Sequence, residues 1–311
     1  MKSAKWFPYL LLLMSLALPT AAAEDTVVLF PPDLTLAKEG KIKIFAFRAG
    51  GGPVSVAVNG TGKDPLKGEA LQTGQAELSP GMNLLDVGGK PIRVYYMANA
   101  GSDRLRILPE KGDGPLEFQA YRIHPALDDG CEGCHAVDGG KLKAKGQKEA
   151  CYACHDNFEK QEEGKKKYVH SPVAAGECTG CHDPHFTVRP KLQKLAKGCL
   201  ECHDVQQAAE SVHSPVPEGR CTDCHGPHVG AAPKQLVRSG NDLCLGCHRN
   251  LHSHHRFSAA VKKAEAIQVP PDLPREKGEF SCLACHVPHQ SAERRLFRKS
   301  QGELCKTCHM I

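Results

Sequence analysis

Eight copies of one short pattern constrain this 311-residue chain more than any other feature: two cysteines separated by two residues and followed at once by histidine. The copies, numbered here as motifs one to eight in chain order, are Cys131-Cys134-His135, Cys151-Cys154-His155, Cys178-Cys181-His182, Cys199-Cys202-His203, Cys221-Cys224-His225, Cys244-Cys247-His248, Cys282-Cys285-His286 and Cys305-Cys308-His309. They use all 16 cysteines. Disulfides and zinc sites need cysteines, but neither needs a histidine at a fixed place after each pair. The pattern therefore argues against both.

The pattern suits covalent attachment of haem. Two thiols three residues apart on one helical turn can reach the two vinyl groups of a haem and form thioethers, and the next residue then directs its imidazole at the iron. Eight motifs therefore predict eight covalently attached haem c groups, with the 16 cysteines as attachment points. The expected proximal iron ligands are His135, His155, His182, His203, His225, His248, His286 and His309.

Nine of the 17 histidines lie outside the motifs, and we expect distal iron ligands among them. Three of them precede a motif by seven or eight residues: His124, His170 and His213. Three others follow a motif as the second residue of a Pro-His pair: His185, His228 and His289. Proline restricts the backbone in these pairs, which favours a fixed histidine geometry.

The remaining three histidines, His252, His254 and His255, form a cluster. Eight bis-histidine irons need eight distal ligands, so two of this cluster are expected to bind iron. We expect one to be the leading ligand of the last repeat. The other is expected to replace the Pro-His pair that the first repeat lacks, since Ala136 and Val137 stand in its place. The sequence leaves open which two of the three are ligands.

The motifs come in pairs, which gives four two-haem units at about 124–155, 170–203, 213–248 and 252–309. The segment Val169–Val173 of the second unit recurs as Val212–Val216 of the third. An insertion around 256–280, rich in Lys, Glu and Pro, is expected to be a surface loop. With so few residues per haem, we expect short helices joined by loops, little strand, and stability that comes from haem packing and ligation.

The first 23 residues have the features of a signal peptide. Lys2 and Lys5 give a positive start, residues 10–18 are mostly apolar, and residues 21–23 are three alanines of the kind found at cleavage sites. We therefore expect an exported protein with no transmembrane segment in the mature chain, located in the periplasm or else outer-membrane-associated or extracellular.

Residues 24–123 contain neither cysteine nor histidine and form a different kind of segment. Apolar residues alternate with others at 42–47, 92–96 and 105–107, and Val54, Val56 and Val58 precede an Asn59-Gly60 turn. This spacing predicts a small antiparallel β-sandwich. The stretch Leu78–Leu84 resembles the turn entering a late strand of bacterial immunoglobulin-like modules, which implies an immunoglobulin-like sandwich. We expect this module to be a spacer or a docking module.

Composition excludes several other classes. A hydrophobic content of 41% with 24% charged residues argues against a disordered chain, and a mean hydropathy of −0.38 argues against a multi-span membrane protein. The formal charge of +5 comes from basic residues scattered among acidic ones, so nucleic acid is not an expected partner.

Residues 124–311 resemble the multihaem c-type cytochromes with doubled CxxCH motifs, which are related to class III cytochromes and common in metal-respiring bacteria. The resemblance rests on the motifs followed by Pro-His, such as Cys178 to His185. It implies low-potential, mostly bis-histidine haems that pass electrons. The expected partners are other redox proteins, namely upstream and downstream cytochromes or quinol-linked donors. Self-association or an outer-membrane porin partner is a further expectation. The first repeat lacks the Pro-His pair, and the β module is not part of the family's core.

The expected function is electron transfer without catalysis. Two alternatives remain open at this stage. An octahaem reductase of nitrogen or sulfur oxyanions would need one haem with an open sixth position, whereas all eight motifs here end in histidine. The chain could also be a structural subunit of a haem filament or of an outer-membrane conduit, with the β module as the connector.

Overall fold

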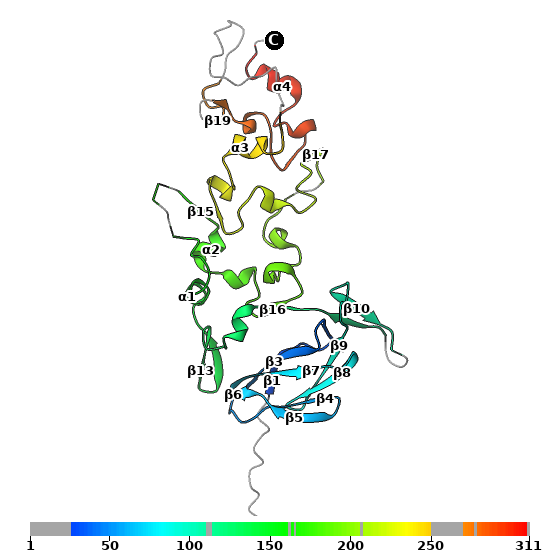
Figure 1. Cartoon of the computed structure of the whole chain (residues 1–311). Helices are drawn as coiled ribbons and strands as arrows, with labels where there is room; N and C mark the ends of the chain where they lie inside the picture. Colours follow the sequence, from blue (N-terminus) through cyan, green and yellow to red (C-terminus); the bar gives the residue numbers. More distant parts are fainter. Residues whose placement is uncertain are drawn as a thin grey trace, which may run out of the picture. The chain divides into compact units, whose positions relative to one another are not determined.

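The computed structural model describes residues 26–109, 114–160, 163–164, 166–205, 208–249, 270–276 and 279–309 (Figure 1). The chain divides into two compact units. The first, called the β module, comprises the described chain up to Tyr121 together with Val137–Lys143. The second, called the motif region, comprises Arg122–Ala136 and the described residues from Ala144 onward.

Two sheets make up the β module. The four-stranded sheet has the order β1-β3-β7-β6 and the seven-stranded sheet the order β10-β11-β2-β9-β8-β4-β5. The strands are β1 (Thr26–Phe30), β2 (Thr35–Ala37), β3 (Lys41–Arg48), β4 (Ser55–Val58), β5 (Thr61–Pro65), β6 (Lys67–Gly68), β7 (Leu71–Glu77), β8 (Gly81–Val87), β9 (Lys90–Tyr96), β10 (Arg104–Ile107) and β11 (Leu116–Gln119).

The alternation of side chains explains these strands. Along β8, Asn83, Leu85 and Val87 are buried while the residues between them are exposed, as a strand with one face toward a core requires. The expected turn is present between β4 and β5, where Asn59 and Gly60 both have positive φ. Two consecutive residues of that kind are typical of the tight turn that joins antiparallel strands.

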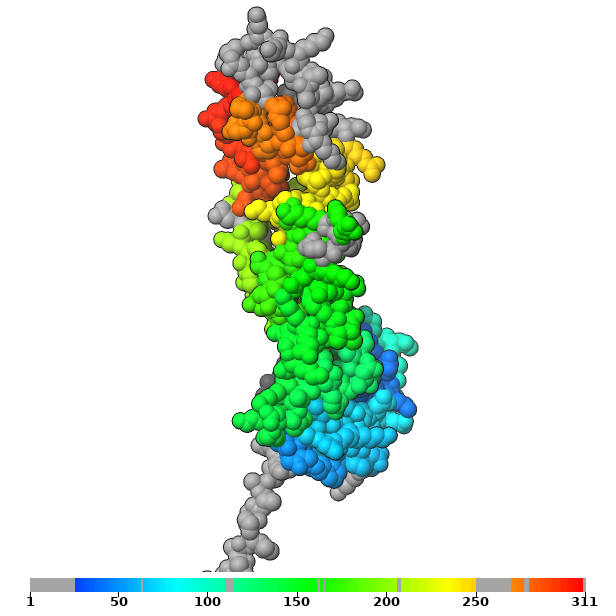
Figure 2. Space-filling view, turned by 90° about the vertical axis from the view of Figure 1, so that its left-hand side faces the viewer, coloured from blue at the N-terminus to red at the C-terminus, as the bar shows by residue number. Residues whose placement is uncertain are grey.

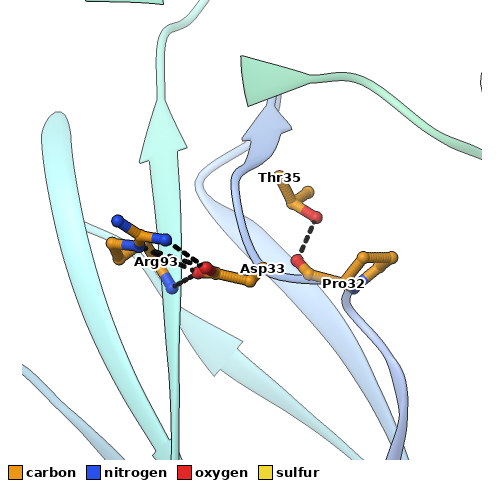
Figure 3. A network of polar contacts seen from close by, with 4 residues as sticks. All are labelled: Pro32, Asp33, Thr35 and Arg93. Carbon is orange, nitrogen blue, oxygen red and sulfur yellow. Dashed lines mark hydrogen bonds and ion pairs between the residues drawn. The ribbon is translucent and has the colours of Figure 1, made fainter. Parts of the chain in front are cut away.

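The expectation of a purely antiparallel sandwich is wrong, because β2 pairs in parallel with both β9 and β11. A polar contact holds the start of β2 beside β9 (Figure 3). The carboxylate of Asp33 accepts hydrogen bonds from the backbone N–H of Arg93 at 2.8 Å and from its Nε at 3.1 Å, and Thr35 Oγ1 donates to the carbonyl of Pro32 at 2.7 Å. The larger sheet is therefore mixed.

Short elements dominate the motif region. Its α-helices are α1 (Gln147–Tyr152), α2 (Ser171–Ala175), α3 (Gly240–Leu245) and α4 (Gln301–Lys306). Its 3₁₀ turns are η1 (Pro125–Asp128), η2 (Cys178–Gly180), η3 (Pro190–Leu192), η4 (Gly198–Glu201), η5 (Cys221–Asp223), η6 (Pro233–Gln235), η7 (Cys282–Ala284) and η8 (Arg294–Leu296). Two-residue strands are β12 (Arg122–Ile123), β15 (Tyr168–Val169), β16 (Phe186–Thr187), β17 (Ser211–Val212), β18 (Val229–Gly230), β19 (Arg275–Glu276), β20 (Glu279–Phe280) and β21 (Gln290–Ser291). A hairpin is formed by β13 (His135–Asp138) and β14 (Lys141–Ala144), and its central residues Val137–Lys143 are those counted with the β module.

The two units differ sharply in their apolar interiors. Ile44, Leu85, Val94 and Phe118 of the β module are completely buried. Among the described residues of the motif region, by contrast, the buried apolar side chains are only those of Ala232 and Ala284. Polypeptide alone therefore builds no ordinary hydrophobic core there. None of the helices in the described ranges is long and apolar enough to cross a membrane.

Candidate haem attachment and ligand sites

Each motif forms a single helical turn. In all eight, the backbone N–H of the histidine donates to the carbonyl of the first cysteine at 2.9–3.1 Å, four residues earlier. Residues three and four apart lie on one side of such a turn. Both thiols and the imidazole of a motif therefore project on the same side, which is the arrangement that attachment of haem at both vinyl groups with a proximal histidine requires.

None of the sixteen cysteines is part of a disulfide, and burial together with neighbouring thiols raises the pKa of several of them. Burial, reinforced by the hydrogen-bonded thiol of Cys178, raises the pKa of Cys151 to about 11. Burial and the hydrogen-bonded thiol of Cys282 likewise raise the pKa of Cys244 to about 12. These thiols face other thiols rather than cationic groups that would ionise them.

Thiol neighbours link consecutive motifs. Hydrogen bonds join Cys151 to Cys178, Cys199 to Cys221 and Cys244 to Cys282, which connects motif two to three, four to five and six to seven. Within each pair of motifs, a cysteine of one motif also raises the pKa of a cysteine of the other: Cys134 that of Cys151, Cys181 that of Cys199, Cys224 that of Cys244 and Cys308 that of Cys285. The eight attachment points therefore follow one another in chain order.

Backbone contacts support the same order. The backbone N–H of Thr179 in motif three donates to Gln147 Oε1 of α1 at 2.8 Å, and the backbone N–H of Cys282 in motif seven donates to Asn241 Oδ1 of α3 at 2.8 Å. Both views of the motif region show its segments following the sequence, from green through yellow to red (Figures 1 and 2). The region is therefore built as a succession of neighbouring motifs.

Histidines outside the motifs lie beside histidines within them. Six such pairs have ring centroids 5.7–6.0 Å apart. The pairs are His124 with His155, His185 with His135, His170 with His203, His228 with His182, His213 with His248 and His289 with His225. All six histidines predicted from the leading positions and the Pro-His pairs thus meet a motif histidine.

The pairs follow a rule that differs between the first and the second motif of a repeat. The second motif of a repeat pairs with the leading histidine of the same repeat, as His203 does with His170. The first motif pairs instead with the Pro-His histidine of the next repeat, as His182 does with His228. Each of repeats one to three therefore depends on the following repeat for one of its histidine pairs.

Short antiparallel ladders hold each leading histidine beside the Pro-His histidine of the next repeat. Strand β12 pairs with β16, β15 with β18 and β17 with β21. Beyond each ladder, a leading histidine donates its backbone N–H to the carbonyl of a Pro-His histidine: His124 to His185 at 2.8 Å, His170 to His228 at 2.9 Å and His213 to His289 at 2.9 Å. One ladder thus positions two histidines from neighbouring repeats.

This arrangement corrects one expectation. The sequence led us to expect a histidine of the 252–255 cluster to serve the first repeat. Instead His135 lies against His185 of the second repeat. The missing Pro-His at Ala136 and Val137 therefore leaves no gap in the first repeat. His252, His254 and His255 lie outside the described residues.

Hydrogen bonds to ring nitrogens set the tautomers. Nδ1 of His182, His225 and His286 lies 2.9–3.0 Å from a backbone carbonyl, of Lys191, Lys234 and Arg295 respectively. A carbonyl can only accept, so Nδ1 carries the proton and Nε2 presents its lone pair, as a metal ligand must. His124 differs, because its Nδ1 accepts from the N–H of Ala126 at 3.3 Å. That contact has to be given up before Nε2 of His124 can bind iron.

Burial favours the neutral form of two histidines that lie outside the motifs, His228 and His289. Burial is the main cause that lowers their pKa values. The neighbouring motif histidine, His182 or His225 respectively, lowers the pKa further. Phe158 stacks on the ring of His228 with centroids 4.4 Å apart and fixes its orientation. A neutral, oriented imidazole is the form that coordinates iron.

The spacing of the pairs fits an iron atom between two imidazoles. Two metal–nitrogen bonds of about 2.0–2.1 Å place facing ring centroids about 6 Å apart. The observed 5.7–6.0 Å agrees with this separation. The Nε2 atoms of His135 and His185 are 3.4 Å apart, so those two rings have to separate slightly to admit a metal. The residues present therefore fit a haem held by two cysteines and two histidines.

Comparison with known proteins agrees with the repeats. The family model described as the doubled CXXCH motif matches residues 170–208, 213–253 and 274–310, which contain the paired motifs of the second, third and fourth repeats. No curated protein and no solved structure matches the chain. Covalently bound haem c follows from the matched motifs, and three paired CXXCH repeats indicate the multihaem c-type cytochrome family.

Proposed function

We propose that the protein is an exported electron-transfer cytochrome that carries eight covalently attached haems. When bound, each haem supplies an iron that alternates between the ferric and ferrous states. The observation that carries the proposal is the set of six histidine pairs, each at the separation that one iron requires and each beside a motif. The succession of thiol neighbours supports a single row of haems in chain order.

The chain's residues favour transfer over catalysis at six of the motifs. If both histidines of a pair held one iron, they would leave no position for a substrate, whereas a reductase needs one open position. Histidine at both positions also lacks the thioether that raises reduction potential, so the potentials are mostly negative. Each ladder positions two histidines that lie outside the motifs and belong to different pairs, as β12 and β16 do for His124 and His185.

For the fourth repeat we propose that two of His252, His254 and His255 are the distal ligands of motifs seven and eight. The pairing rule supports the choice. Motif eight requires a leading histidine of its own repeat, and the cluster stands before motif seven as His213 stands before motif five. Motif seven is the first motif of the last repeat, so no following repeat supplies its histidine. A second histidine of the 252–255 cluster is therefore proposed for it.

Intact mass and spectroscopy of the native protein test the proposal. The mass should correspond to the chain without its first 23 residues plus eight haems. Electron paramagnetic resonance and resonance Raman spectra should show low-spin, six-coordinate haem, and a redox titration should span mostly negative potentials. Fewer than eight haems, or a titration centred well above zero, would refute it. A substantial high-spin fraction would favour a reductase.

Location and partners complete the proposal. The features of residues 1–23 support export to the periplasm, and the family resemblance supports other redox proteins as partners in respiratory electron transport. Cell fractionation with N-terminal sequencing tests export. Electron microscopy of native material distinguishes a free carrier from a haem filament or an outer-membrane conduit.

A further inference from the structure

Three copies of one backbone device act on motif histidines. The carbonyl oxygens of Lys191, Lys234 and Arg295 accept hydrogen bonds from Nδ1 of His182, His225 and His286, each nine residues earlier, at 2.9, 2.9 and 3.0 Å. The three recipients belong to motifs three, five and seven, the first motif of repeats two, three and four. The recurrence at one position of three repeats marks a built feature rather than a chance contact.

The carbonyls are aimed by an unusual conformation, called here the left-handed turn. Lys191, Lys234 and Arg295 have φ of 54°, 62° and 58°, and the residue after each also has positive φ: Leu192, Gln235 and Leu296. Residues other than glycine avoid this region because the Cβ atom is crowded there. Two such residues in succession, in three places, show that the surrounding structure maintains a conformation the chain would otherwise leave.

A second hydrogen bond fixes each left-handed turn against its motif. The carbonyls of Leu192, Gln235 and Leu296 accept from the backbone N–H of the residue after each proximal histidine, at 2.8, 2.7 and 2.8 Å. Consecutive carbonyls of the turn thus bind the ring of the histidine and the backbone beside it. The position of each ring is therefore set by main-chain atoms, independently of the Lys or Arg side chain.

We infer that the left-handed turns tune the haems of motifs three, five and seven, and that they lower the reduction potentials of those haems relative to the haem of motif six. The inference rests on the proposed function. A carbonyl that accepts from Nδ1–H makes a coordinated imidazole a stronger electron donor. Stronger donation stabilises ferric iron over ferrous iron, so second-sphere hydrogen bonding shifts the potential downward.

Motif six provides the contrast within the same repeat as motif five. In the part of the chain that the structure describes, neither His248 nor its partner His213 has a hydrogen bond at a ring nitrogen, and the two rings lie 5.9 Å apart. Motif four is less suitable, because His170, the partner of its His203, has Nδ1 3.1 Å from the carbonyl of Pro227. Potentials along motifs five, six and seven therefore alternate between low, high and low.

Replacement of Lys234 in the haem-loaded full-length protein tests the tuning. Lys234→Val places a β-branched residue in the left-handed region, which it avoids, and withdraws the carbonyl from His225. Lys234→Asn removes the same charge but tolerates the conformation. In a spectroelectrochemical titration, Lys234→Val should move one-eighth of the absorbance change to higher potential, and Lys234→Asn should titrate as wild type. Equal shifts in both variants would assign the effect to charge and overturn the inference, as would no shift in either.

A measurement on the wild type covers the case in which Lys234→Val does not load haem. In reduced protein labelled with ¹⁵N-histidine, the Nδ1 protons of His182, His225 and His286 should exchange with deuterium more slowly than that of His248. Equal exchange would overturn the inference. Haem counting by mass separates this failure from failure of the proposed function, because an octahaem protein without these shifts contradicts only the tuning.

Discussion

The imidazole rings of His135 and His185 lie nearly parallel, at 16°, with centroids 5.7 Å apart, although they belong to different repeats. His185 follows His182 by only three positions, yet His182 pairs with His228 of the third repeat. A histidine so close in sequence to the proximal ligand cannot reach the opposite side of the same haem, because the connecting backbone would have to pass around the edge of the macrocycle. The Pro-His pair therefore serves the preceding repeat.

The pairing rule predicts which haem each distal histidine serves. His289→Ala should produce high-spin, five-coordinate haem at motif five, because His289 lies beside His225, and should leave motif seven unchanged. Resonance Raman spectra of the ferrous protein report the change. The matched variant His213→Ala should give the same signal at motif six. To locate the signal, Cys221→Ala and Cys224→Ala are added to His289→Ala. Persistence of the high-spin signal in this triple variant contradicts the rule.

The cluster at residues 252–255 has its own prediction. His252→Ala, His254→Ala and His255→Ala, made singly, should yield high-spin haem in two of the three variants, since two irons of the fourth repeat need ligands. Electron paramagnetic resonance of the oxidised protein detects it. If fewer than two variants show the signal while the wild type is fully low-spin, a ligand from a neighbouring subunit becomes the better explanation.

The sequence was informative where chemistry fixes spacing and less so where packing decides. Attachment positions followed from motif spacing alone, because two thioethers and a ligand need one helical turn. Alternation of apolar residues located strands such as β9. It could not place β2, whose three residues Thr35–Ala37 are all buried and show no alternation. The repeats gave the number of distal histidines but not their partners, because the ladders that bring His170 beside His228 join different repeats.

The contact that holds β2 against β9 predicts a pH-dependent contribution to stability. Side-chain hydrogen bonds from Arg93 are the main cause that lowers the pKa of Asp33 below its ordinary 3.8. The stabilisation is therefore present above pH 3.8 and is lost as the pH falls through the folded-state pKa. Since both side chains are more than a third exposed, Asp33→Asn should cost less than about 1 kcal/mol at pH 7.

Hydrogen exchange measured by mass spectrometry checks this prediction. At pH 7 the peptide that covers β9 should exchange faster in Asp33→Asn than in the wild type, and the difference should vanish when both are compared below the folded-state pKa of Asp33. Lys41→Ala is a suitable control, because its contact with Glu77, at 3.2 Å, joins side chains that are 64% and 83% exposed. A difference that persists at low pH would point to packing rather than charge.

Without haem, the β module should stay folded and the motif region should unfold. The β module buries Ile44, Leu85, Val94 and Phe118 completely, whereas the described residues of the motif region bury only two alanines among their apolar side chains. Polypeptide without haem therefore gains too little from apolar burial in the motif region to offset the entropy of ordering it. Protein in which all sixteen cysteines are replaced by alanine should lose the helical signal in circular dichroism. Limited proteolysis should degrade it from the C-terminal side and leave a resistant fragment that ends near Tyr121.

One outcome would contradict this prediction. If residues beyond 121 of the variant resisted protease to the same extent as they do in the haem-loaded protein, the chain rather than its cofactors would hold the motif region together.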